Sequence, residues 1–78
     1  MTGKLINKNN LVSGDKIRFS YHDKQRVGTV EERWNDTPRC RAGFTLRHVE
    51  ETGRKFSSFN FDKVDGRSPV STGIDLLG

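Results

Sequence analysis

The stretch KIRFSY at residues 16–21 decides the fold class of this chain. Its apolar residues Ile17, Phe19 and Tyr21 alternate strictly with polar ones, so they lie on one face of an extended strand. Aromatic and β-branched residues at a period of 2 are typical of a strand with one buried face. We therefore expect a β-strand over residues 16–21.

The other strands are predicted from apolar runs that are separated by turn residues. They cover residues 26–34, 44–50 and 54–61, with a last short strand expected within residues 70–77. Val27 and Val30 are the expected apolar anchors of the second strand, but their spacing breaks the alternation. Gly28 between them predicts a bulge or a tight bend.

Short strands with frequent turns predict a small all-β domain. We expect five antiparallel strands closed into a barrel, because closure removes the exposed sheet edges. Residues 11–78 form this single domain. Residues 1–10 are polar and carry no periodic apolar pattern, so they are expected to be a loose arm that folding does not require.

Size and composition limit the function. A chain of 78 residues with 31% hydrophobic residues has room for one modest core and no deep cavity, which argues against an enzyme. The 14 Lys and Arg residues against 10 Asp and Glu residues give a net charge of +4. This charge suits a nucleic-acid partner or an acidic protein partner, but it also lies within the ordinary range for solubility.

The single cysteine, Cys40, excludes an intramolecular disulfide bond. The chain begins without an apolar signal segment, and no apolar run is long enough to cross a membrane. We therefore expect a cytoplasmic protein that has no membrane partner.

Two resemblances support the barrel. Val12-x-Gly14-Asp15-x-Ile17, followed by residues 28–30 (GTV), resembles the opening hairpin of Src-homology-3-like and Sm-like barrels. Residues 16–65 resemble a WYL domain more specifically. An I-x-F-x-Y strand precedes an Arg-bearing strand, and residues 44–46 (FTL) fall where that family has its Trp-Tyr-Leu signature. Residues 53–64 are similar to the family's ending, an aromatic strand that leads into Asp-Arg-Ile.

The chain also departs from the WYL pattern. Only Leu46 of the signature tripeptide is kept, and Lys63 and Val64 stand where the family has Arg and Ile. The helix-turn-helix that usually accompanies a WYL domain is missing.

The WYL resemblance implies a positively charged groove to which Tyr21, Arg26 and Lys63 contribute. Tyr21 would offer a ring and a hydroxyl, and the two cations would bind a nucleic acid or another anionic ligand. At position 63 the family has an arginine, whose guanidinium can bind an anion through two hydrogen bonds, whereas the ammonium group of Lys63 is a point charge. In the alternative, Tyr21 packs in the core and the cations pair with Glu31, Glu32 or Asp62.

A second candidate site is the basic region of residues 33–47. Its members are Arg33, Trp34, Arg39, Arg41 and Arg47. Four arginines against one acid, Asp36, give it a net charge of 4 − 1 = +3. Arginines bind phosphates in a bidentate way, and an exposed aromatic ring can stack on a base. In the alternative, Trp34 caps the end of the barrel and the arginines only solvate the loop.

No cofactor, metal or catalytic residue is expected. Cys40, His22 and His48 are too few and too scattered for a zinc site, and His48 is predicted to lie on the sheet face that also carries Leu46. The sequence therefore predicts a non-enzymatic binding or regulatory module, with single-stranded nucleic acid as its expected partner. The alternative is a protein-interaction module that docks on an acidic partner surface.

Overall fold

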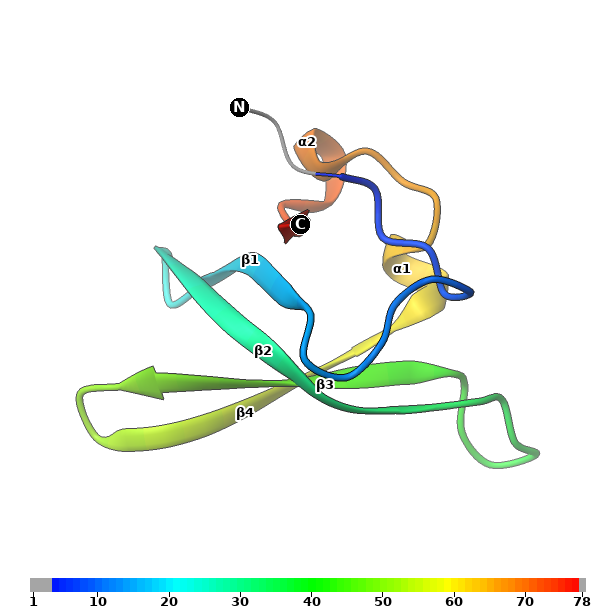
Figure 1. The fold of residues 1–78 in the computed structure, drawn as a ribbon, viewed down its shortest axis with the longest axis horizontal. Helices are drawn as coiled ribbons and strands as arrows, with labels where there is room; N and C mark the ends of the chain where they lie inside the picture. The colour runs from blue at the N-terminus through cyan, green and yellow to red at the C-terminus, as the bar shows by residue number, and fades with distance from the viewer. Residues whose placement is uncertain (1–3, 78) are drawn as a thin grey trace.

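The computed structural model describes residues 4–77, and a five-stranded antiparallel sheet dominates it (Figure 1). The strands are β1 (Lys16–Tyr21), β2 (Lys24–Trp34), β3 (Gly43–Glu50), β4 (Gly53–Asn60) and β5 (Asp75–Leu77). Two single-turn helices, α1 (Phe61–Val64) and α2 (Pro69–Thr72), lie between β4 and β5. The prediction of an all-β fold is confirmed.

The β1–β2 hairpin follows from the alternation in residues 16–21 and from a two-residue turn. Tyr21 pairs with Lys24, and the turn residues His22 and Asp23 have φ angles of 50° and 65°. Two left-handed residues in a two-residue loop match the right-handed twist of the flanking strands. The strand β1 has the bounds that the sequence predicts.

The irregularity in β2 lies at Glu31 and not at Gly28. The register with β3 shifts between Val30 and Glu32, so Glu31 is the extra residue of a bulge. Gly28 instead allows close packing, since a Cβ atom there would lie 3.1 Å from the Cβ of Leu46. The expectation that Val27 is a core anchor is wrong, because Gly28 and Val30 occupy the buried face and Val27 points to solvent.

The sheet is not closed into a barrel. Its strand order is β4-β3-β2-β1-β5, and within residues 4–77 the two edge strands β4 and β5 do not pair with each other. After β4 the chain turns through α1 and α2 and then forms β5, which is three residues long. This strand pairs with β1 at three positions.

The core lies on the sheet face that residues 4–15 and the segment of α1 and α2 cover. In the view of Figure 1, the N-terminal segment, α1 and α2 lie above the β3–β4 hairpin, which runs along the bottom. The buried apolar side chains are Ile6, Leu11, Ile17, Phe19, Val30, Phe44, Leu46, Phe61, Val64 and Ile74. The predicted inward face of the third strand, with Phe44, Leu46 and His48, is confirmed.

Residues 4–10 are not a loose arm, and residues 1–3 of that prediction lie outside the described part. Ile6 is only 1% exposed and belongs to the core. Lys4 exchanges backbone hydrogen bonds with Leu76 of β5 at 3.0 and 3.1 Å, and the amide of Lys8 donates to the Asp65 carboxylate at 2.7 Å. A single buried side chain has no periodicity, which is why the sequence pattern missed this contact.

The C-terminal part contains turns of helix that the sequence pattern did not predict. Phe61, expected at the end of the fourth strand, begins α1 and buries its ring in the core. Ser68 caps α2 by accepting a hydrogen bond from the amide of Val70 at 3.2 Å. Neither helix within residues 4–77 has the length and apolar character needed to cross a bilayer.

Candidate functional site

The loop between β2 and β3 is ordered by its own hydrogen bonds. Thr37 and Cys40 are joined by two backbone-donated bonds, from the Thr37 amide to the Cys40 carbonyl (2.8 Å) and from the Cys40 amide to Thr37 Oγ1 (2.9 Å). Asp36 accepts a hydrogen bond from the amide of Ala42 at 2.7 Å. These contacts fix the loop and leave the side chains of Arg39 and Arg41 exposed.

Trp34 is half-buried at the base of this loop. Its indole Nε1 donates to the carbonyl oxygen of Arg41 at 2.8 Å, and it lies opposite Gly43 in the β2–β3 register. A Cβ atom at Gly43 would lie 2.8 Å from Trp34 Cζ2 and 2.3 Å from the carbonyl oxygen of Phe59. The indole therefore rests on β3 because residue 43 has no side chain.

Several of the predicted cationic residues already have partners within the chain. Arg33 donates to the backbone oxygen of Leu11, and its guanidinium carbon lies 5.4 Å from the centre of the Phe61 ring. Arg47 pairs with Glu31 at 3.3 Å, across the bulge of β2. These two arginines support the fold, and their positive charge is partly compensated.

Arg41 and Arg39 remain the most available cations of the basic region. Arg41 is exposed and makes a long ion pair of 3.6 Å with Asp62 of α1. For Arg39, the ion pairs described within residues 4–77 include no partner. In the basic region of residues 33–47, the most exposed cations are thus Arg39 and Arg41, on the loop that follows Trp34.

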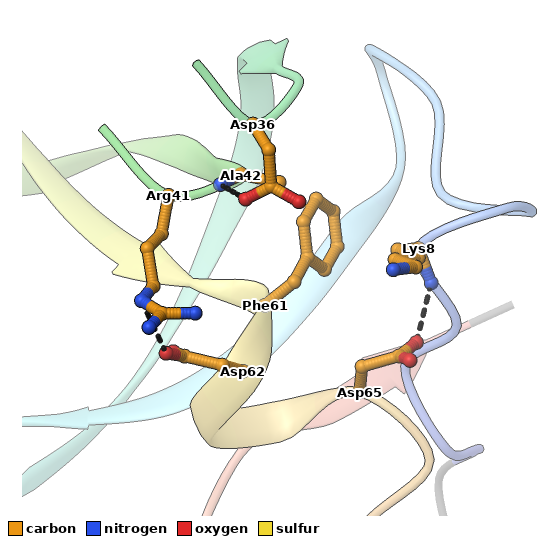
Figure 2. Close-up of a pocket in the computed structure, with 7 residues that line it drawn as sticks. All are labelled: Lys8, Asp36, Arg41, Ala42, Phe61, Asp62 and Asp65. Carbon is orange, nitrogen blue, oxygen red and sulfur yellow. Dashed lines mark hydrogen bonds and ion pairs between the residues drawn. The ribbon is translucent and has the colours of Figure 1, made fainter. Parts of the chain in front are cut away.

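A small pocket beside Arg41 is acidic (Figure 2). It has a volume of about 160 Å³, and its lining includes Asp36, Asp62 and Asp65. Each carboxylate has a donor: the Ala42 amide, the Arg41 guanidinium and the Lys8 amide, respectively. Within residues 4–77 no group of three His, Cys, Asp or Glu residues is arranged to hold a metal ion.

The groove predicted from the WYL resemblance is assembled only in part. Tyr21 and Arg26 line a pocket of about 270 Å³ between the tips of the two hairpins, whereas Lys63 lies on α1 and is not among the lining residues. Tyr21 packs against the core, and Arg26 pairs with Glu50 at 2.7 Å. The alternative prediction paired Arg26 with Glu31, Glu32 or Asp62, whereas the ion pair described for it within residues 4–77 is with Glu50.

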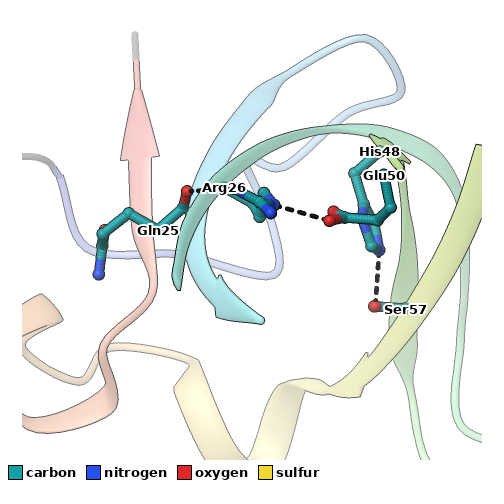
Figure 3. Close-up of polar contacts among 5 residues, drawn as sticks. All are labelled: Gln25, Arg26, His48, Glu50 and Ser57. Carbon is teal, nitrogen blue, oxygen red and sulfur yellow. Dashed lines mark hydrogen bonds and ion pairs between the residues drawn. The ribbon is translucent and has the colours of Figure 1, made fainter. Parts of the chain in front are cut away.

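A polar network beside this pocket was not anticipated (Figure 3). His48 is 3% exposed, and its Nδ1 lies 2.7 Å from Glu50 Oε2 while its Nε2 lies 2.9 Å from Ser57 Oγ. Because an ionised carboxylate only accepts, Nδ1 carries the proton that is donated to Glu50. The other carboxylate oxygen accepts from Arg26 Nε at 2.7 Å.

The order Ser57–His48–Glu50 is that of a nucleophile, a base and an orienting carboxylate. The histidine ring, however, is packed edge-on against Phe19 and Tyr21, with ring centroids 5.0 and 4.7 Å away. The pocket nearest the network is lined by Glu50 but by neither His48 nor Ser57. The network satisfies the hydrogen-bonding groups of a buried histidine.

The network makes stability depend on the charge of Glu50. Partial burial raises the pKa of Glu50, but hydrogen bonds from His48 and Arg26 and the charge of Arg26 outweigh it and hold this pKa below its usual value. A carboxylate whose pKa is lower in the folded state stabilises the fold above its unfolded pKa. This contribution is lost as the pH falls through the folded pKa.

We expect Glu50→Gln to flatten the acid limb of the stability curve. Thermal melts of the parent should lose stability as the pH falls below 4.5, the ordinary glutamate value, and through the lower folded pKa of Glu50; the variant should lose less over the same pH range. Glu51→Gln, a neighbouring exposed carboxylate in the turn, is the control and should follow the parent. Parallel curves for the parent and Glu50→Gln would show that the carboxylate contributes nothing through its charge.

Comparison of the chain with models of protein families, with curated proteins and with solved structures gives no match. The resemblance to WYL domains therefore stays a prediction.

Proposed function

We propose that the chain is a non-enzymatic binding module that takes single-stranded nucleic acid or another anionic ligand at the β2–β3 loop. The observation that carries this proposal is the half-buried indole of Trp34, held by its bond to the backbone carbonyl of Arg41 at the base of the loop that carries the exposed Arg39 and Arg41. A fixed ring can stack on a base, while guanidinium groups bind the phosphates. A pre-ordered loop also loses less conformational entropy on binding.

The salt dependence of binding tests the cationic part of this proposal. Each neutralised phosphate contributes about −0.7 to the slope of log K against log salt for single strands, so Arg39 and Arg41 together predict about −1.4. Arg39→Ala should make the slope shallower by about 0.7 and weaken all sequences alike. Fluorescence titrations with single-stranded DNA and RNA at several salt concentrations measure both quantities.

Trp34→Ala tests the stacking part. It should cost about 1–3 kcal/mol in binding and leave the salt slope unchanged, because stacking releases no counterions. Arg67→Ala removes an exposed arginine between α1 and α2, away from the β2–β3 loop. It is the matched control for Arg39→Ala and should bind with parental affinity. A melting curve must show that Trp34→Ala still folds. If the parent binds no single strand at low salt, the nucleic-acid proposal fails.

A protein partner is the second candidate. The observation that favours it lies on the outer face of the sheet, where Val49 and Phe56 are 77% and 56% exposed. They stand beside Arg47 and Arg54, a mixture of apolar and arginine side chains that is typical of protein interfaces. An acidic partner would complement these arginines, and its binding would survive the loss of Trp34 stacking.

A further inference from the structure

A serine on the edge strand β4 lies at the end of the polar network around His48. Ser57 Oγ is 2.9 Å from His48 Nε2, and His48 Nδ1 is 2.7 Å from Glu50 Oε2. Because Nδ1 of the neutral imidazole carries the proton that Glu50 accepts, Nε2 is the unprotonated nitrogen and accepts the hydroxyl proton of Ser57. A general base needs this tautomer to activate a hydroxyl group.

The imidazole of His48 is fixed in this orientation by its neighbours. Arg26 Nε donates to the second carboxylate oxygen of Glu50 at 2.7 Å, so both oxygens of that carboxylate are bound. The rings of Phe19 and Tyr21 pack edge-on against the imidazole. The base therefore needs no reorientation before it accepts a proton.

The hydroxyl group, unlike the imidazole, is open to solvent. Ser57 is partly exposed, whereas His48 is 3% exposed. Ser57 belongs to β4, an edge strand that pairs only with β3 within residues 4–77. A small reagent can therefore reach Ser57 Oγ from the open edge of the sheet, and the buried base accepts the proton through a hydrogen bond that already exists.

The open edge of β4 also provides a backbone donor next to Ser57. The amide of Phe61 donates to the carbonyl of Ala42 at 2.9 Å, which makes these two residues a hydrogen-bonded pair of the β3–β4 ladder. Bonded and non-bonded pairs alternate along an antiparallel ladder, so Thr45 and Ser58 form a non-bonded pair. The N–H group of Ser58 therefore points away from β3, where it can donate to the oxygen anion of a tetrahedral intermediate at Ser57.

We infer that Ser57 is a modification site that accepts an acyl group from an activated ester, such as a thioester or an aryl ester, with His48 as the general base. The Ser57 oxygen forms a bond to the carbonyl carbon of the ester while its proton passes to His48 Nε2. The bond from that carbon to the leaving group then breaks, and the imidazolium gives its proton to the departing thiolate or phenolate. The product is an acyl ester on Ser57. This single transfer requires no turnover and does not rest on the proposed nucleic-acid site.

The experiment treats the full chain with para-nitrophenyl acetate and locates the acetyl group by peptide mass spectrometry. An acetyl ester should appear on Ser57, and hydroxylamine should release it, whereas an acetyl amide on a lysine survives this treatment. Ser58 is the internal comparison, because its exposed hydroxyl lies 3.1 Å from Thr45 Oγ1 and has no imidazole partner. If Ser57 carries no ester, or if Ser58 is acetylated as fast as Ser57, the inference is wrong.

Glu50→Gln tests whether His48 acts as the base. The glutamine amide can donate to Nδ1 and shift the ring proton to Nε2, where the ring no longer accepts the Ser57 proton. Acetylation of Ser57 should slow at least about a hundredfold, the lower end of what a general base supplies. The far-downfield proton resonance expected for His48 Nδ1 should disappear in the same variant, a change that loss of packing alone does not predict.

Glu51→Gln is the matched control, because it removes an exposed carboxylate from the adjacent position. It should be acetylated at the parental rate and keep the downfield resonance. A Glu50→Gln variant that folds, as a thermal melt would show, and still acetylates Ser57 at the parental rate would overturn the inference. The comparison of Ser57 with Ser58 in the parent remains decisive if Glu50→Gln does not fold.

Discussion

Leu46→Ala is expected to destabilise the domain by about 2–5 kcal/mol, the usual cost of truncating a buried leucine. Leu46 is fully buried in the middle of β3, opposite Val30 on β2 and Ser57 on β4. Its Cβ also lies within close reach of Gly28, so the backbones around it are already packed tightly and have little freedom to fill the cavity.

This loss is large for a domain of 78 residues, whose total stability is of the order of 4–12 kcal/mol. A thermal melt should show a fall of at least about 10 °C in Tm. Val49→Ala, on the same strand but 77% exposed, is the control and should melt within a few degrees of the parent. A parental Tm for Leu46→Ala would contradict the register of β3, and an equal loss from Arg39→Ala would contradict the dominance of core packing.

The strands that the sequence predicts best are those in which alternation is unbroken. Residues 16–21 form β1 with the expected bounds, and β3 gains only Gly43 relative to the prediction. In β2 the alternation is interrupted by the bulge at Glu31, an irregularity that depends on pairing with β3 and leaves no local signature. Placing the bulge at Gly28 instead put Val27 on the wrong face.

Closure of the sheet could not be predicted from the pattern of apolar residues. A periodic pattern tells which face of a strand is buried but not which strands meet. Here the chain leaves β4 through α1 because Phe61 turns into the core, where its ring lies 5.2 Å from that of Phe44. Similarly, the backbone of Lys4 hydrogen-bonds to Leu76 of β5, at the edge of the sheet. Contacts between backbone groups do not depend on the side chain, so the sequence pattern does not reveal them.

The candidate site was predictable in its location but not in its available charges. The loop residues Arg39 and Arg41 are exposed as expected, whereas Arg33 and Arg47 are held by partners that only the fold brings near. The His48 network was accessible in part from the sequence. Because side chains alternate along a strand, His48 and Glu50 lie on the same face of β3 as Leu46, so a buried histidine beside an acid could have been anticipated. The contact with Ser57 could not, because it depends on the register between β3 and β4.

Ile6→Ala should destabilise the domain by about 2–5 kcal/mol, in contrast to what a loose N-terminal arm would show. Ile6 packs into the core at 1% exposure, and its carbonyl accepts a hydrogen bond from the amide of Gly66 at 2.8 Å. Truncation leaves a cavity beneath the segment that also covers the β5 edge, so β5 should lose protection from hydrogen exchange before the rest of the sheet.

Leu5→Ala is the matched control for Ile6→Ala, because Leu5 is the preceding residue and is 50% exposed. Urea unfolding of the two variants should separate them clearly, with the midpoint for Leu5→Ala close to that of the parent and the midpoint for Ile6→Ala well below it. If both variants keep the parental midpoint, residues 4–10 add nothing to the core. If both lose stability equally, the burial of Ile6 is not the cause, since the exposed leucine would then contribute as much as the buried isoleucine.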